Sequence, residues 1–313
     1  MFKYSNTNKR YYTLDYYYKK RFGSKVAKIN LDANFTCPNI DGTKGYGGCI
    51  YCLNGSSDFT KKVPLIDQFN IRKSVMLNKW PKAKLIAYFQ ANTNTYDTVD
   101  NLKKRFEPIL SQDGVVGLAI ATRADAIKDE VLDYLIDLNS RTYLTIELGL
   151  QTIFESTSKL INRCHSLKCF DECVKKLRKN NIDVVVHIIN GLPYESKQMM
   201  IDTIKHLNTL DIQGVKIHML SIVKGTRIAE MYEEKPFKML SKDEYIDIVC
   251  DQIENLNEDI VIHRLTGDPI KESLIEPKWI VNKIDVLNGI DKELKRRNTY
   301  QGIKTKSQNQ ELV

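Results

Sequence analysis

The stretch Val184-Val185-Val186-His187-Ile188-Ile189 is a run of β-branched residues broken by a single histidine. A run that is apolar on both faces predicts a strand covered on each side by other structure, which is how parallel strands are buried. Similar short apolar runs occur at 26–33, 85–89, 115–121, 144–148 and 215–222. The sequence therefore predicts six buried strands.

Segments with helical periodicity separate these runs. The segments 129–138 and 170–179 place apolar residues three and four positions apart, which predicts helices with one buried face. Strands and helices that alternate about six times favour an α/β fold, namely a partial (β/α)6 TIM-like barrel with ligands at the carboxyl ends of the strands. An open doubly wound sheet is the alternative.

The overall composition is that of an ordinary globular protein. The chain has 313 residues and is 42% hydrophobic, which excludes collagenous and largely disordered classes. No apolar run approaches the roughly 18 residues of a membrane span, and residues 1–10 lack the apolar core of a secretory signal. We therefore expect a cytoplasmic protein without a membrane partner. The net charge of +8 suits a polyanionic partner.

Two terminal regions stand outside the repeat. The sequence divides into a basic aromatic N-terminal arm at 1–24, a core barrel at 25–240 and a C-terminal helical extension at 241–313. In the arm, tyrosines alternate with lysines and arginines, so the rings can stack on nucleotide bases. The same rings can instead pack on the barrel, and the sequence leaves both interpretations open.

Three of the seven cysteines, Cys37, Cys49 and Cys52, lie on one loop after the first predicted strand. An odd number of cysteines in a chain of this size favours reduced thiols over a disulfide framework. Four glycines between Cys37 and Cys52 allow the backbone to fold tightly around a bulky group. Thiolates select zinc or iron–sulfur chemistry. Three thiols without an obvious fourth ligand favour a 4Fe-4S cluster with one open iron over structural zinc, which remains the alternative.

A three-cysteine loop that ends in Cys-x-aromatic-Cys and leads a βα chain resembles the radical S-adenosylmethionine (SAM) superfamily. The eleven residues between Cys37 and Cys49 resemble a narrower group, the YtqA/YhcC-like, Elp3-related radical SAM family. The segments that share this resemblance are FTCPN at 35–39, YFQANTNTY at 88–96, ELGLQ at 147–151, GLP at 191–193 and HRLTGD at 263–268.

The resemblance implies a radical SAM barrel and a radical SAM enzyme. Cys37, Cys49 and Cys52 would hold a 4Fe-4S cluster, and its fourth iron would bind the amino and carboxylate groups of SAM. One electron, from a flavodoxin- or ferredoxin-type donor, would then cleave SAM to a 5'-deoxyadenosyl radical that takes a hydrogen atom from the substrate.

The same resemblance implies that the strand ends supply the SAM contacts. These residues are Tyr51 near the adenine, Gln90 and Thr93 after the second strand, Thr122 after the third, Gln151 after the fourth, Arg163 for the carboxylate and His187 for the ribose. Judged by residue chemistry alone, such polar groups can equally satisfy local backbone atoms, and Arg163 can form a surface ion pair.

The implied substrate is tRNA. Members of the YtqA-like branch are linked to maturation of the wobble uridine, in which a carboxymethylaminomethyl side chain is converted to aminomethyl. The positive net charge and the basic aromatic arm agree with an RNA partner. Two alternatives remain, namely a radical SAM enzyme acting on another substrate and a non-catalytic RNA-binding protein that uses the three cysteines as a metal knuckle.

Overall fold

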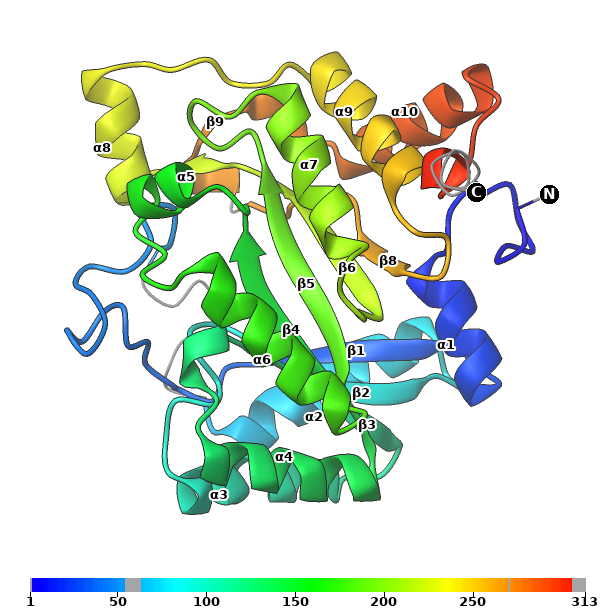
Figure 1. The fold of residues 1–313 in the computed structure, drawn as a ribbon. Coiled ribbons are helices and arrows are strands. Elements are labelled where there is room, and N and C mark those ends of the chain that lie inside the picture. The colour runs from blue at the N-terminus through cyan, green and yellow to red at the C-terminus, as the bar shows by residue number, and fades with distance from the viewer. Residues whose placement is uncertain (1, 54–62, 270, 306–313) are drawn as a thin grey trace.

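Seven parallel strands form one curved sheet in the part of the chain that this computed structural model describes, residues 2–53, 63–269 and 271–305 (Figure 1). In spatial order they are β1 (Val26–Leu31), β2 (Lys84–Phe89), β3 (Val115–Thr122), β4 (Tyr143–Gln151), β5 (Asp183–Asn190), β6 (Gly214–Met219) and β8 (Val261–Arg264). This order follows the sequence without the reversal of a doubly wound sheet. The predicted partial barrel is confirmed, with one strand more than the six predicted runs.

The predicted apolar runs account for β1 to β6. The run 215–222 also contains the start of β7 (Ile222–Val223), which pairs antiparallel with β9 (Leu274–Glu276). The additional strand, β8, lies within the segment 241–313, for which the sequence indicated helices. Its four residues include His263 and Arg264, so the run is too short and too polar to be recognised as a buried strand.

Helices cover the outer face of the sheet (Figure 1). Those that follow the strands are α2 (Leu65–Lys79), α3 (Val99–Leu110), α4 (Asp129–Arg141), α6 (Leu167–Lys179) and α7 (Lys197–Leu207). The remaining helices are α1 (Leu14–Phe22), α5 (Glu155–Leu160), α8 (Arg227–Glu234), α9 (Lys242–Asn255) and α10 (Lys283–Arg296), with short 3-10 turns η1 (Ala124–Ala126), η2 (Lys271–Ser273) and η3 (Lys278–Val281).

The two faces of each strand meet different surroundings. In β4, Leu144, Ile146 and Leu148 belong to the main apolar core, and Glu147 between them binds lysines from β1 and β6 across the barrel interior. Because side chains alternate along a strand, the outer face packs on helices while the inner face carries polar groups. The polar inner face is therefore available for a site.

The N-terminal arm packs on the barrel. Tyr11, Tyr12 and Tyr18 are buried, and the Tyr12 ring stacks on Tyr4 with centroids 4.2 Å apart. The backbone carbonyl of Tyr12 also accepts a hydrogen bond from the Ile262 amide of β8 at 2.8 Å. Of the two interpretations of the arm, packing is therefore confirmed for these rings, and only their exposed neighbours can meet a partner.

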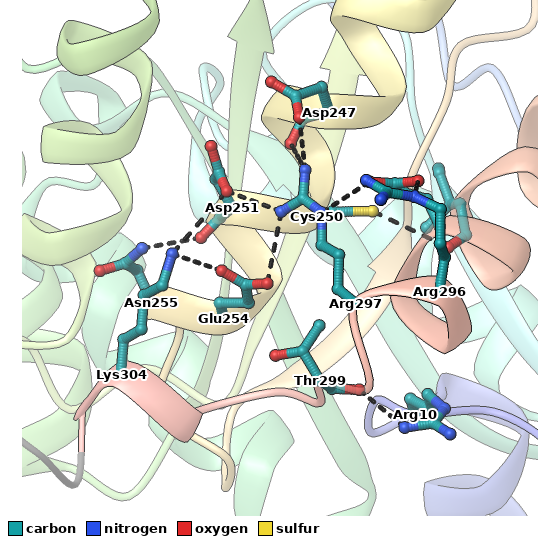
Figure 2. A network of polar contacts seen from close by, with 12 residues as sticks. Arg10, Asp247, Cys250, Asp251, Glu254, Asn255, Arg296, Arg297, Thr299 and Lys304 are labelled. Atoms are coloured by element: carbon teal, nitrogen blue, oxygen red, sulfur yellow. Dashed lines mark hydrogen bonds and ion pairs between the residues drawn. The ribbon is translucent and has the colours of Figure 1, made fainter.

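Charged side chains fasten the end of α10 to α9 (Figure 2). The Arg297 guanidinium lies 2.7 Å from Asp251, 2.7 Å from Glu293 and 3.3 Å from Glu254. Lys304 also binds Glu254. The basic end of this helix is therefore partly neutralised by acids of the same protein. The rest of the C-terminal extension, residues 306–313, lies outside the described residues.

Candidate functional site

The cysteine loop leaves the carboxyl end of β1 and folds back on itself. The carbonyl of Cys37 accepts from the Ile40 amide at 2.8 Å, and the Cys52 amide donates to the Cys49 carbonyl at 3.0 Å. A Cβ on Gly45 would lie 2.2 Å from the Asn39 side chain and 2.8 Å from the Cys164 sulfur. Glycine is therefore required at this position, as the sequence suggested for a tightly folded loop.

Two asparagines attach this loop to the segment after α5. The Asn39 amide donates to the carbonyl of Asn162 and lies 3.6 Å from the Cys49 sulfur. The Asn162 amide in turn donates to the carbonyls of Gly48, at 2.7 Å, and Tyr46, at 3.1 Å. These two residues fix the position of Cys49, and sequence reasoning missed both, because an asparagine in a loop is usually part of a turn.

The thiols of Cys49 and Cys52 form a coupled pair. The pKa of Cys49 falls to about 6, chiefly because the Cys52 thiol donates a hydrogen bond to it, and Tyr51, Arg123 and Asn39 add to the effect while burial opposes it. The same hydrogen bond and burial raise the pKa of Cys52 well above its usual value. Since the thiolate is the form that binds metal, Cys49 is prepared to act as a ligand at neutral pH.

Arg123 supplies the positive charge beside these thiols. It follows β3, is almost completely buried, and forms two hydrogen bonds of 2.9 Å to Asp125. Among the described residues, no three His, Cys, Asp or Glu side chains converge closely enough to hold a single metal ion.

A cavity of about 380 Å³ connects the cysteine loop to the later strands. Three of the residues expected to contact SAM line it together with Cys52, namely Tyr51, Gln151 and His187. Gln151 ends β4 with a φ of 68°, a left-handed conformation that is uncommon for a residue with a side chain and is often found at functional sites. The cavity is also lined by His218 and Arg264 from the late strands, to which the sequence assigned no specific role.

Four other expected SAM contacts do not line this cavity among the described residues. The Thr122 hydroxyl lies 2.6 Å from the hydroxyl of Thr95. The backbone amide of Gln90 donates a hydrogen bond of 3.0 Å to the backbone carbonyl of Leu31. Thr93 is buried, and its amide donates at 3.2 Å to the carbonyl of Thr36, the neighbour of Cys37. Thr93 therefore contacts the start of the cysteine loop, and its buried hydroxyl has no hydrogen-bond partner among the described residues.

Arg163 does not form the surface ion pair that its residue type alone would allow, because it is buried. It is 1% exposed, and its guanidinium donates to the carbonyls of Leu150 and Thr152, at 2.6 Å each, and of His165, at 3.0 Å. It therefore joins the end of β4 to the segment before α6. One nitrogen, Nη2, has no hydrogen-bond partner among the described residues and lies 3.9 Å from Glu155.

A buried network of charges contacts His187, which lines the cavity. Glu147 binds Lys28 at 2.7 Å, His187 at 2.8 Å, and also Lys216. Lys216 in turn lies 3.1 Å from the Tyr88 hydroxyl. Charged residues in otherwise apolar strands signal such a network, because a buried charge needs a partner. The sequence alone did not show which residues pair.

Burial and pairing set the charges in this network. Although burial alone would raise the pKa of Glu147, the charges of Lys216 and Lys28 and the hydrogen bond with His187 hold it well below its usual value. Burial lowers the pKa of Lys216 to about 7. Burial and the Lys216 charge lower that of His187 to about 4, so His187 is neutral at physiological pH.

Comparison with known proteins identifies the family. A model described as the radical SAM superfamily matches residues 43–207, and one described as the radical SAM C-terminal domain matches residues 212–296. YtqA of Bacillus subtilis (strain 168) is 51% identical over 304 residues, which cover 96% of this chain and 94% of YtqA. A tRNA uridine(34) acetyltransferase of Methanocaldococcus infernus is 27% identical over 137 residues, covering 43% of this chain and 25% of that protein.

The fold is also shared with a solved structure. Elp3 of Methanocaldococcus infernus superposes with a TM-score of 0.68 at 17% identity, over 89% of this chain and 64% of that chain. None of the helices in the described ranges has the length and apolarity needed to cross a membrane. From the matched family models and the extent of its identity with YtqA, the chain belongs to the radical SAM superfamily, in the family that contains YtqA.

Proposed function

We propose that this protein is a radical SAM enzyme whose Cys37, Cys49 and Cys52 hold a 4Fe-4S cluster. The residues fit such a group: three thiols lie on one loop, Cys49 favours the thiolate, and Arg123 compensates negative charge beside them. When bound, the cluster supplies the electron that cleaves SAM to the radical which takes hydrogen from the substrate. Tyr51, Gln151 and His187 would hold SAM in the cavity that Cys52 also lines.

The remaining task of the chain is to position the reactants and exclude water. The inner face of the barrel surrounds the cavity on the side of β4, β5 and β6, and His187 is fixed from below by Glu147. A neutral imidazole held in this way presents a defined surface to a ribose or a substrate. Because the cavity lies between the cysteine loop and the late strands, a substrate that enters it comes next to the cofactor.

Anaerobic reconstitution tests this assignment. We expect iron near four atoms per chain and reductant-dependent release of 5'-deoxyadenosine from SAM. One tightly held zinc ion without SAM cleavage would instead support the metal-knuckle protein and contradict the enzyme.

For the substrate, we propose the wobble uridine of tRNA, with conversion of its carboxymethylaminomethyl side chain to aminomethyl. Support comes from the net charge of +8, from the family that contains YtqA, and from the similarity to a protein named as a tRNA uridine(34) acetyltransferase. The electron would come from a flavodoxin- or ferredoxin-type donor.

Nucleoside mass spectrometry of tRNA from a deletion strain tests the substrate. We expect the carboxymethylaminomethyl nucleoside to accumulate and its aminomethyl-derived products to disappear. Unchanged wobble nucleosides would exclude this substrate while leaving the radical chemistry in place, and SAM cleavage that tRNA does not affect would point to a small-molecule substrate.

A further inference from the structure

The β6 and β8 side of the cavity carries polar groups to which the SAM assignment gives no role. His218 lies on the same face of β6 as Lys216, two residues further along, and Lys216 pairs in register with Arg264 of β8. Both His218 and Arg264 line the cavity, on strands other than those expected to contact SAM. These two side chains therefore stand together at the part of the cavity left for a substrate.

Arg264 is only partly neutralised. Its guanidinium lies 2.9 Å from Asp268, which is the only carboxylate among the described lining residues. The same carboxylate is shared with Lys283, whose ammonium lies 2.9 Å and 3.1 Å from its two oxygens. Two cations thus face one anion at the mouth of the cavity.

A second group of charged residues lies in the barrel interior and contacts the cavity through His187. Lys28 and Lys216 share the single carboxylate of Glu147, and both lysines lie in the barrel interior. Arg264 shares the Asp268 carboxylate with Lys283, so the β8 side of the cavity carries positive charge that attracts an anionic group.

In the same cavity, His218 offers a neutral ring nitrogen. Its Nε2 is buried and has no hydrogen-bond partner among the described residues. Burial, then the neighbouring His187 and Arg264, lower the pKa of His218 well below its usual value. An unprotonated imidazole can accept a hydrogen bond from an amine, and a buried polar atom left unpaired is costly unless a ligand completes it.

From this arrangement we propose that Arg264 and His218 form a substrate subsite for an aminocarboxylate group, in which Arg264 binds the carboxylate and His218 accepts a hydrogen bond from the amine. This inference rests on the proposed function, because a carboxymethylaminomethyl uridine bears a carboxylate one carbon away from a secondary amine. The subsite distinguishes this substrate from its aminomethyl product, which lacks the carboxylate.

The test compares two anticodon stem-loop RNAs that differ only at the wobble uridine, one carboxymethylaminomethyl and one aminomethyl. Their affinities are measured for the cluster-loaded protein with SAM and without reductant. We expect the wild type to prefer the carboxylate-bearing RNA by about ten-fold or more, the effect of one charge-assisted hydrogen bond. Arg264→Gln should abolish that preference, and His218→Phe should reduce it several-fold.

Arg141→Gln is the matched control, because it removes the same charge from α4 and is expected to keep the preference. If Arg264→Gln keeps the preference, or weakens both RNAs equally as a phosphate contact would, the subsite is wrong. Weaker SAM binding with an unchanged preference would assign Arg264 to the carboxylate of the cofactor and also overturn it. His218→Phe gives an independent answer if Arg264→Gln fails to fold.

The outcomes separate this inference from the proposed function. If the deletion strain accumulates the carboxymethylaminomethyl nucleoside while the Arg264 variant still discriminates the two RNAs, the function stands and the subsite falls. If the nucleosides are unchanged and the wild type does not discriminate the two RNAs, the function falls and the subsite falls with it.

Discussion

Glu147→Gln tests the buried charge network directly. The substitution keeps the shape of the side chain but removes the charge that Lys28 and Lys216 share. The Glu147 side chain is 0% exposed and those of the lysines are 16% and 8% exposed, so water cannot replace the lost partner. Breaking such a buried pair costs about 3–5 kcal/mol, and we expect a loss of this size in the free energy of unfolding at pH 6.

The loss in the free energy of unfolding should also change with pH in a predictable direction. In the wild type, the pKa of Lys216 is about 7, so Lys216 is protonated in the folded protein at pH 6. Without Glu147 its pKa falls further, and the folded variant loses this proton while the unfolded chain keeps it. The destabilisation should therefore shrink by about 1 kcal/mol as pH rises from 6 to 7, because Lys216 of the folded wild type goes from about nine-tenths to half protonated while the folded variant has already lost this proton.

Equilibrium urea denaturation, followed by circular dichroism under anaerobic reducing conditions, measures both quantities. Glu172→Gln is the matched control, because Glu172 and its partner Lys168 are exposed and 3.8 Å apart, and we expect an effect below about 0.5 kcal/mol. A loss under about 1 kcal/mol for Glu147→Gln at pH 6, or a loss that grows as pH rises, would refute the reasoning.

Three further predictions address the rest of the molecule. Cys52→Ala should abolish stable iron binding, whereas the control Cys250→Ala should retain it, because Cys250 lies in the apolar core. Iron and sulfide analysis after reconstitution tests this prediction. Arg297→Gln should lower the thermal midpoint and cost about 1.5–3 kcal/mol, because it removes a largely buried cation whose hydrogen bonds join acids of α9 to α10; an unchanged midpoint would contradict this. Neutralising the cations at 19–21, which are exposed on α1, should weaken RNA binding and reduce the slope of log affinity against log salt by about two to three; if neither changes, the arm does not contact RNA.

Patterns that are local in the chain were predictable. The β-branched runs gave six strands and the three- and four-residue spacing gave the covering helices, because both periodicities are set by backbone geometry. β8 was missed because four residues that include His263 and Arg264 form a strand only when the edge of β6 is there to pair with them. Tertiary context overrode a weak local signal.

In the candidate site, too, the sequence could predict the residues that lie close together in the chain. The sequence placed Cys37, Cys49 and Cys52 on one loop and, through family resemblance, Tyr51, Gln151 and His187 near SAM. Local spacing could identify the loop, since its thiols are close in the chain.

What the sequence by itself determined is therefore the alternation of strands and helices and the chemistry of the cysteine loop. Only the tertiary structure decided that Glu147 meets Lys28 and Lys216, that Arg163 binds backbone carbonyls, and that Arg264 reaches the same cavity as His218. The physical reason is that these contacts join residues far apart in the chain. Curvature and strand order bring them together, and no periodicity along the sequence specifies a partner across a barrel.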